Sequence, residues 1–195
     1  MFISHADTAL EAWLRAALPL SEEVGDVSFD APNGQWSAQL SRITVSLFLY
    51  DVSRSTRPSA AAQLRRTPDG TVESRRRPLP MMTLSYLVSA WAGSPRDEHQ
   101  LLSDVVGLLA ATDAVPAQFL ADDAVSGIQL QLGDERAVPR ELWTAAGGQL
   151  KASTLLQATV AADAFDWEAA APPVERLAAM ARRMDDATRG GARAR

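Results

Sequence analysis

Residues 43–91 decide the fold, because two long alternating runs enclose a segment of a different kind. The first run reads ITVSLFLY (Ile43–Tyr50) and the second reads MMTLSYLVSAW (Met81–Trp91). In each run apolar residues recur at every second position, which is the period of a β-strand with one buried face. Several of these residues are β-branched or aromatic, the types that strands favour. We therefore predict that both runs are half-buried strands at the centre of one sheet.

The segment between the two runs is too basic to belong to a core. Residues 52–77 hold seven arginines against only two acids. A strong turn sequence, TPDGT at 67–71, lies in its middle, and the flanks 63–66 and 72–75 can pair as a protruding hairpin. A basic hairpin on a rigid base suits an acidic surface of another chain; a solvated hairpin with no partner is the alternative. We predict a partner interface at these arginines: Arg54, Arg57, Arg65, Arg66, Arg75, Arg76 and Arg77.

The bulk properties indicate a globular protein with an uneven charge distribution. The chain has 195 residues, which suits one domain with appendages. The net charge is −5, and the basic segment lies between acidic regions at 1–51 and 91–141. The absence of cysteine excludes disulfides and thiolate metal ligands. No apolar run reaches the roughly 18 residues of a membrane span, and we see no signal peptide. We expect a cytoplasmic protein that does not insert into a membrane.

The remaining sequence alternates between helix and strand patterns. Ser94 followed by Pro95 is typical of a helix start, and Gly147-Gly148 of a helix end. Residues 36–41 could extend the first long strand. The patterns predict helices at 4–18, from 95 to about 109 and at 139–146, a helical turn at 116–120, and shorter strands at 27–30, 127–132 and 153–162.

These elements predict an α+β fold with one domain over residues 1–171. Its sheet is mixed, mostly antiparallel and covered by helices. Pro172-Pro173 separates this domain from a C-terminal part, 172–195, that holds one helix and a disordered basic tail. The helix has an apolar stripe, which we predict to be a second partner interface: Val174, Leu177, Ala181 and Met184.

No pattern of catalytic, cofactor-binding or metal-binding residues is found. The two histidines, His5 and His99, are isolated in the sequence, and no nucleophile elbow or phosphate loop is present. A small-molecule enzyme on an α+β scaffold stays an alternative, because acids far apart in sequence can meet in space. A nucleic-acid-binding module is another, through the basic segment. Only Tyr50 lies near the arginines in sequence, however, so we expect no aromatic stacking platform there.

Five blocks of the sequence together resemble a known family. A neutral strand ends in Leu-Tyr (Val45–Val52), and a Pro-Leu block leads into Leu-Ser-Tyr-Leu-Val-Ser-Ala-Trp (Arg77–Trp91). A His-Gln-Leu-Leu helix follows (His99–Leu109). The other two blocks are Leu142-Trp143 and a strand that begins at Ser153-Thr154-Leu155. Over about residues 5–165 the chain resembles the tail-cap, or tail-terminator, proteins of extracellular contractile injection systems, which are similar in role to the terminators of contractile phage tails.

This resemblance implies a structural subunit and no enzymatic activity. Such a subunit would form a ring, of six copies, on the membrane-distal end of the inner tube. There it would stop the growth of tube and sheath and join the two. Its partners would be further copies of itself and the tube and sheath proteins, with no nucleic acid and no cofactor. It would be found in the cytoplasm as part of an assembled particle.

Overall fold

The structure, a computed structural model that describes residues 2–21, 23–57, 61–122 and 124–170, is built on a five-stranded sheet. The two long strands, β2 (Ile43–Arg54) and β5 (Met81–Trp91), are antiparallel neighbours at its centre, as the alternation predicts. The strand order is β1-β2-β5-β7-β6, where β1 is Gly25–Ser28, β7 is Ser153–Ala161 and β6 is Gln129–Leu132. β1 runs parallel to β2, and the other neighbours are antiparallel. The prediction of an α+β fold with a mostly antiparallel sheet is confirmed.

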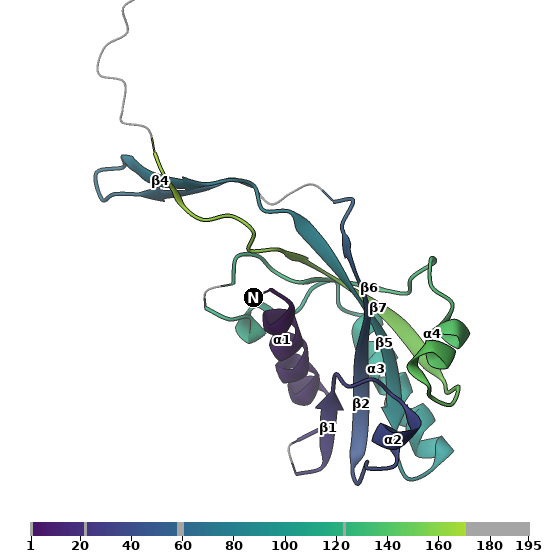
Figure 1. The fold of residues 1–195 in the computed structure, drawn as a ribbon. Coiled ribbons are helices and arrows are strands. Elements are labelled where there is room, and N and C mark those ends of the chain that lie inside the picture. The colour runs from purple at the N-terminus through teal and green to yellow at the C-terminus, as the bar shows by residue number, and fades with distance from the viewer. Residues whose placement is uncertain (1, 22, 58–60, 123, 171–195) are drawn as a thin grey trace, which may run out of the picture.

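Two long helices cover one face of this sheet (Figure 1). They are α1 (Phe2–Ala17) and α3 (Pro95–Ala110), and α3 begins as predicted, with the Ser94 hydroxyl accepting a hydrogen bond from the Asp97 N–H. Leu84 and Tyr86 of β5 are fully buried in the resulting core. The buried stripe of α3 consists of Leu101, Val105 and Leu109, whereas Leu102 is only partly buried against the same core.

The opposite face of the sheet is also covered, so the prediction of half-buried strands is wrong for β5. Helix α4 (Pro139–Ala146), found where it was predicted, places the fully buried Trp143 against Leu87 and Leu155. Trp143 also packs against Trp91, at 6.1 Å between ring centroids. As a result eight consecutive residues of β5, 83–90, are buried on both sides.

Residues 36–41 do not extend β2, contrary to the prediction. A short helix, α2 (Gly34–Ser37), begins where the Asn33 side chain accepts a hydrogen bond from the Trp36 N–H at 2.8 Å. This cap stabilises a helical turn, and the Trp36 ring then packs edge-on against Trp91 at 5.2 Å. The carbonyl of Pro32 approaches Gly148 so closely that a Cβ there would lie 2.3 Å from the oxygen. The segment is thus fixed by contacts with residues distant in sequence.

The predicted hairpin is present and forms part of a second, three-stranded sheet. Its strands are β3 (Gln63–Arg66), β4 (Val72–Arg76) and β8 (Glu168–Ala169), in the order β3-β4-β8. The turn at 67–71 joins β3 to β4, with the Thr67 N–H donating to the Thr71 carbonyl at 2.9 Å and Gly70 at a φ of 87°. Figure 1 shows this second sheet projecting away from the body, and we call it the arm.

The arm continues the three central strands of the body in the same order. β3 follows β2, β4 precedes β5 and β8 follows β7 along the chain. Pro78 and Pro80 lie between β4 and β5, and because proline has no N–H donor they interrupt the ladder. At the base of the arm, the Ala162 N–H still donates to the Pro80 carbonyl at 2.9 Å. The two sheets are therefore one ribbon with a break at the prolines.

Candidate assembly interface

The seven arginines predicted as an interface lie along the arm and at its base. Arg54 ends β2, and Arg57 follows it in the link to β3, where its side chain donates a hydrogen bond to Gln129. The remaining five lie on or next to the arm strands: Arg65 and Arg66 on β3, Arg75 and Arg76 on β4, and Arg77 directly after β4. The structure thus distributes the seven arginines from the base of the arm along its strands β3 and β4.

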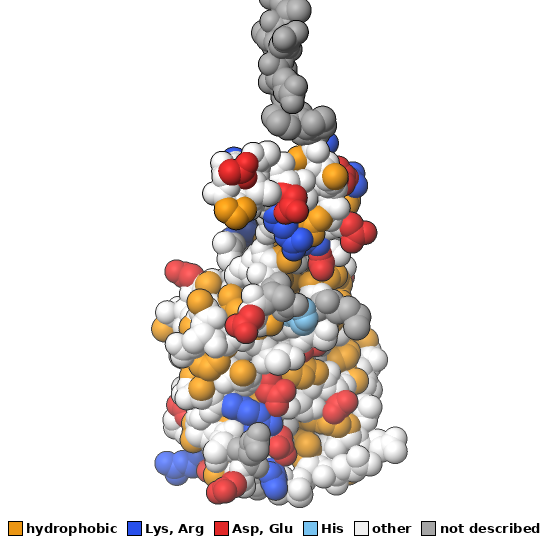
Figure 2. Space-filling model, turned by 90° about the vertical axis from the view of Figure 1, so that its left-hand side faces the viewer, with side chains coloured by type: hydrophobic (Ala, Val, Ile, Leu, Met, Phe, Trp, Pro, Cys, Tyr) orange, Lys and Arg blue, Asp and Glu red, His pale blue; other side chains and the backbone are white. Residues whose placement is uncertain are grey.

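Three of these arginines are already paired within the chain. The carboxylate of Glu168 lies 3.2 Å from Arg77 and 3.9 Å from Arg75, and Asp163 forms an ion pair with Arg76. Both acids belong to the 163–169 segment, which leads from β7 into β8. Figure 2 accordingly shows acidic and basic side chains interspersed on the arm. The uniformly basic hairpin expected from the sequence is therefore partly neutralised by acids about 90 residues further along the chain.

Arg76 differs from the other arginines because it is buried, contrary to the prediction that this segment cannot bury itself. Its side chain is 9% exposed, and its Nε donates a hydrogen bond to the Phe165 carbonyl at 2.5 Å. A buried guanidinium requires such partners to offset its loss of hydration. Arg76 therefore fastens the 163–169 segment to the hairpin, and we remove it from the residues offered to a partner.

Aromatic side chains also meet the arginines, which corrects the expectation of no stacking platform. The guanidinium of Arg65 lies 4.1 Å from the centroid of the Trp167 ring, and that of Arg77 lies 4.3 Å from the Phe165 ring. Such cation–π contacts are worth about 0.5–1 kcal/mol each at exposed sites. Sequence reasoning missed these aromatics because they are distant in sequence. The alternation of acids and aromatics in Asp-Ala-Phe-Asp-Trp-Glu (163–168) was the signal that could have indicated a strand here.

The other four arginines, Arg54, Arg57, Arg65 and Arg66, form no ion pair with any described residue. All four are exposed: Arg54 ends β2, Arg57 lies in the link after it, and Arg65 and Arg66 lie on β3. They are the basic groups that remain available to a carboxylate of another chain, and guanidinium groups bind carboxylates in a bidentate geometry.

A polar hollow of about 370 Å³ lies at the base of the arm, between Arg54, Arg57 and Arg136. Its wall includes Asp134, whose side chain is only 5% exposed and accepts hydrogen bonds from the Tyr50 hydroxyl and the Arg136 N–H, both at 3.0 Å. Burial alone would raise the pKa of Asp134, but these hydrogen bonds outweigh it and hold the pKa below its usual value. Burial and the same carboxylate raise the pKa of Tyr50 to about 12. The hollow thus has a charged wall in which hydrogen bonds hold Asp134 in place.

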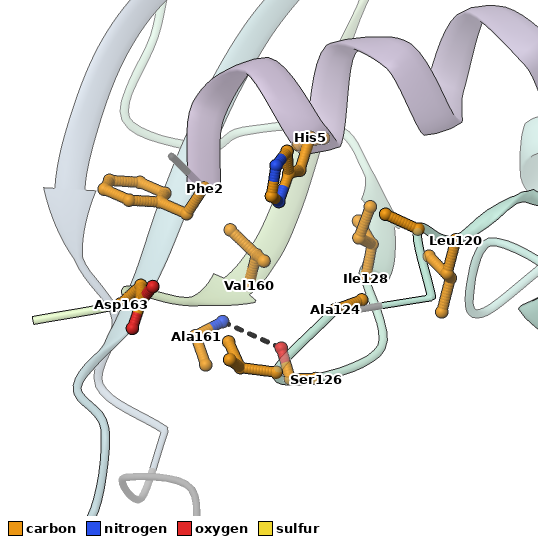
Figure 3. A pocket seen from close by; sticks show the side chains of 12 residues that line it. Phe2, His5, Leu120, Ala124, Ser126, Ile128, Val160, Ala161 and Asp163 are labelled. Carbon is orange, nitrogen blue, oxygen red and sulfur yellow. Dashed lines mark hydrogen bonds between the residues drawn. The ribbon is translucent and has the colours of Figure 1, made fainter. Parts of the chain in front are cut away.

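A smaller cavity of about 170 Å³ lies at the N-terminal end of α1. Figure 3 shows Phe2 and His5 of α1, Val160 of β7 and Ile128 around it, with a hydrogen bond from the Ala161 N–H to the Ser126 hydroxyl. Nine of its twelve lining residues are apolar, and no hydrogen bond links His5 to Asp163 in the described residues. In the described residues no group of three or more potential metal ligands is found. None of the helices in that part of the chain has the length and apolarity needed to cross a bilayer.

The second predicted interface, with Val174, Leu177, Ala181 and Met184, lies outside the described residues.

Comparisons with known proteins give one family and a set of similar folds. The family described as the Pvc16 N-terminal domain matches residues 5–176. The sheath/tube terminator of an extracellular contractile injection system, PVC, in its extended state superposes with a TM-score of 0.67 at 20% identity, over 94% of this chain. The tube-terminating cap of the anti-feeding prophage superposes with a TM-score of 0.59 at 18% identity, over 90% of this chain. This chain spans only 64% and 60% of those two proteins. No curated protein matches it in sequence.

Proposed function

This chain belongs to the Pvc16 N-terminal domain family, and we propose that it is a structural subunit that caps the inner tube of a contractile injection system. The family match over residues 5–176 is the observation that carries this proposal. The likeness in fold to a sheath/tube terminator and to a tube-terminating cap supports it. A cap of this kind ends the growth of tube and sheath and joins the two, and it needs no catalytic site.

We propose further that the chain acts as a ring of six copies on the membrane-distal end of the tube. Cyclic rings form when one surface of a subunit meets a different surface of the next copy. Surfaces of opposite charge support this proposal, namely the exposed arginines that form no ion pair with a described residue and the acidic 163–169 segment. The particle would assemble in the cytoplasm, where the cap meets the tube and sheath proteins.

The partner residues divide into two groups under this proposal. Arg54 and Arg57, at the rim of the polar hollow, would contact acidic side chains of the tube or sheath end. Electrostatic contacts of this type steer assembly and fix register more than they add affinity. The helix predicted at 174–187 would dock on a neighbouring subunit through its apolar stripe. It belongs to a separate C-terminal part, 172–195, that follows the domain of residues 1–171.

Co-expression with the tube and sheath proteins of the same particle tests the proposal. With the full chain present, negative-stain images should show tubes of one narrow length distribution, each closed by a ring at one end. Without it, tubes should vary widely in length. As a matched variant, Arg54→Glu with Arg57→Glu should leave the circular dichroism spectrum unchanged and broaden the length distribution. Tubes of equal length with and without the chain would contradict the capping function.

A further inference from the structure

The arm has two strand edges that no described strand covers. In the order β3-β4-β8, the outer side of β3 and the outer side of β8 both lack a neighbour among the described residues. The β6 edge of the body sheet differs, because the Leu130 N–H donates to the Asp113 carbonyl at 2.8 Å and Val115 donates to Ile128 at 2.9 Å. Proteins usually protect open edges, because free N–H and C=O groups pair readily with other chains. Among the described residues, the body sheet is protected at β6, whereas both edges of the arm lack a neighbouring strand.

The arm also lacks a hydrophobic core of its own. Among the residues of its three strands, Arg76 is the only buried one, and Leu64 on β3 is 51% exposed. Small sheets without an apolar face to bury are marginally stable in water. Yet the arm projects into solvent, with neither α1 nor α3 packed on it (Figure 1). Such a sheet is expected to gain stability by pairing with a further strand.

The two open edges carry opposite charges. Arg65 and Arg66 on β3 are in no ion pair with a described residue, although Arg65 stacks on Trp167 and Arg66 donates a hydrogen bond to the Gly70 carbonyl. At the other edge, Asp166 is exposed and Glu168 is 44% exposed, although Glu168 also pairs with Arg75 on its inner side. Opposite charges on neighbouring strands stabilise a pairing, whereas like charges oppose it. The β3 edge is therefore complementary to the β8 edge and repels a second β3 edge.

From these observations we infer that the arms of neighbouring copies join edge to edge, with β3 of one copy pairing with β8 of the next. Because β3 and β8 are both antiparallel to β4, they run in the same direction within one arm. When neighbouring copies are related by rotation about an axis parallel to the strands, each strand keeps its direction. β8 of one copy is then parallel to β3 of the next. The contact joins two different surfaces, and such a contact builds a closed ring when the rotation between neighbouring copies divides a full turn evenly. This inference rests on the proposed ring and names the surface that builds it.

Cysteine cross-linking tests the contact, since the natural chain has no cysteine. Leu64 pairs with Arg75, which pairs with Glu168, so Leu64 and Glu168 lie on the same face of the arm. Within one copy they are two strands apart, roughly 10 Å between Cα atoms, which is beyond the reach of a disulfide. The full chain with Leu64→Cys and Glu168→Cys should therefore form only disulfides between copies. Oxidation should give a ladder of linked species, whereas a control with Leu64→Cys and Val138→Cys should stay unlinked.

Charge exchange supplies an independent measurement on the full chain. Arg66→Glu alone and Asp166→Arg alone should each shift the ring toward monomers in native mass spectra at physiological salt. Their combination in one chain restores opposite charges at every junction and should shift the equilibrium back toward rings. Rings of normal mass with no disulfide ladder and no charge effect would overturn the arm contact but leave the capping function intact. Monomers in every preparation, including those with tube protein added, would overturn the ring itself.

Discussion

The hydrogen bond between Tyr86 and Asp7 is a sensitive test of how the core is built. Tyr86 is fully buried on β5, and its hydroxyl donates to the Asp7 carboxylate of α1 at 2.7 Å. Burial raises the pKa of Asp7, and the hydrogen bond from Tyr86 opposes part of that rise. Burial and the nearby carboxylate also raise the pKa of Tyr86 far above its usual value, so the phenol stays protonated and remains the donor.

Tyr86→Phe removes this donor without changing the packing volume of the ring. A hydrogen bond to a charged group contributes about 1.5–3 kcal/mol, and we expect a loss of that size at pH 7. For a chain of this length, roughly 2–4 °C in Tm accompany each kcal/mol. Asp7→Asn should cost less, because its amide oxygen can accept the same hydrogen bond and no charge is then buried. In the Asp7→Asn background, Tyr86→Phe should cost only about 0.5–1.5 kcal/mol.

The pH dependence gives this prediction a sign. The pKa of Asp7 is higher in the folded protein than in the unfolded chain. Between these two pKa values the folded protein binds more protons than the unfolded chain. The contribution of Asp7 to the free energy of unfolding therefore falls as the pH rises through that range. Tyr86→Phe removes the group that lowers this pKa, so its cost should shrink at acid pH, where Asp7 is protonated. Urea unfolding followed by circular dichroism, at neutral and at acid pH, measures both effects. A Tyr86→Phe variant as stable as the natural protein at pH 7, or equally destabilised at both pH values, would refute the reasoning.

Three further predictions concern the helices, the arm and the C-terminal part. Leu101→Ala should lower the free energy of unfolding by about 2–5 kcal/mol, and Leu102→Ala should lower it clearly less, because only Leu101 belongs to the buried stripe of α3. Equal losses in the two variants would show that the buried face of α3 is assigned incorrectly. Arg76→Glu should increase amide hydrogen exchange in the arm and leave exchange in the body unchanged, whereas Arg54→Glu, at an exposed position outside the arm strands, should leave exchange in the arm unchanged; unchanged exchange in both variants would show that the buried arginine does not fasten the arm. Deleting 172–195 should leave a soluble domain with the same circular dichroism spectrum, and an insoluble product would show that the deleted part completes the core.

Local signals in the sequence were sufficient for most of the elements. The alternation in 43–50 and 81–91 predicted the central strands, because every second side chain faces the same core. The start of α3 at Pro95 followed from a capping serine and a proline, and the hairpin followed from the turn at 67–71. Each of these signals depends on residues within a few positions of one another, so it can be read without knowledge of the fold.

The contacts that the sequence did not indicate are those between distant segments. The burial of β5 on its second face depends on Trp143, more than 50 residues beyond the strand. The helical turn at Trp36 is favoured by a local cap but fixed by packing on Trp91. At the candidate interface, Arg76 is buried because the 163–169 segment returns to the hairpin. Counting charges along 52–77 could therefore point to a candidate interface but could not tell the arginines that form ion pairs within the chain from those that do not.

Cryo-electron microscopy of tubes assembled with this chain tests the central claim most directly. The capping function predicts a closed ring of this protein at one end of each tube. Density for the chain along the tube wall, or at neither end of tubes that stop at a normal length, would contradict it.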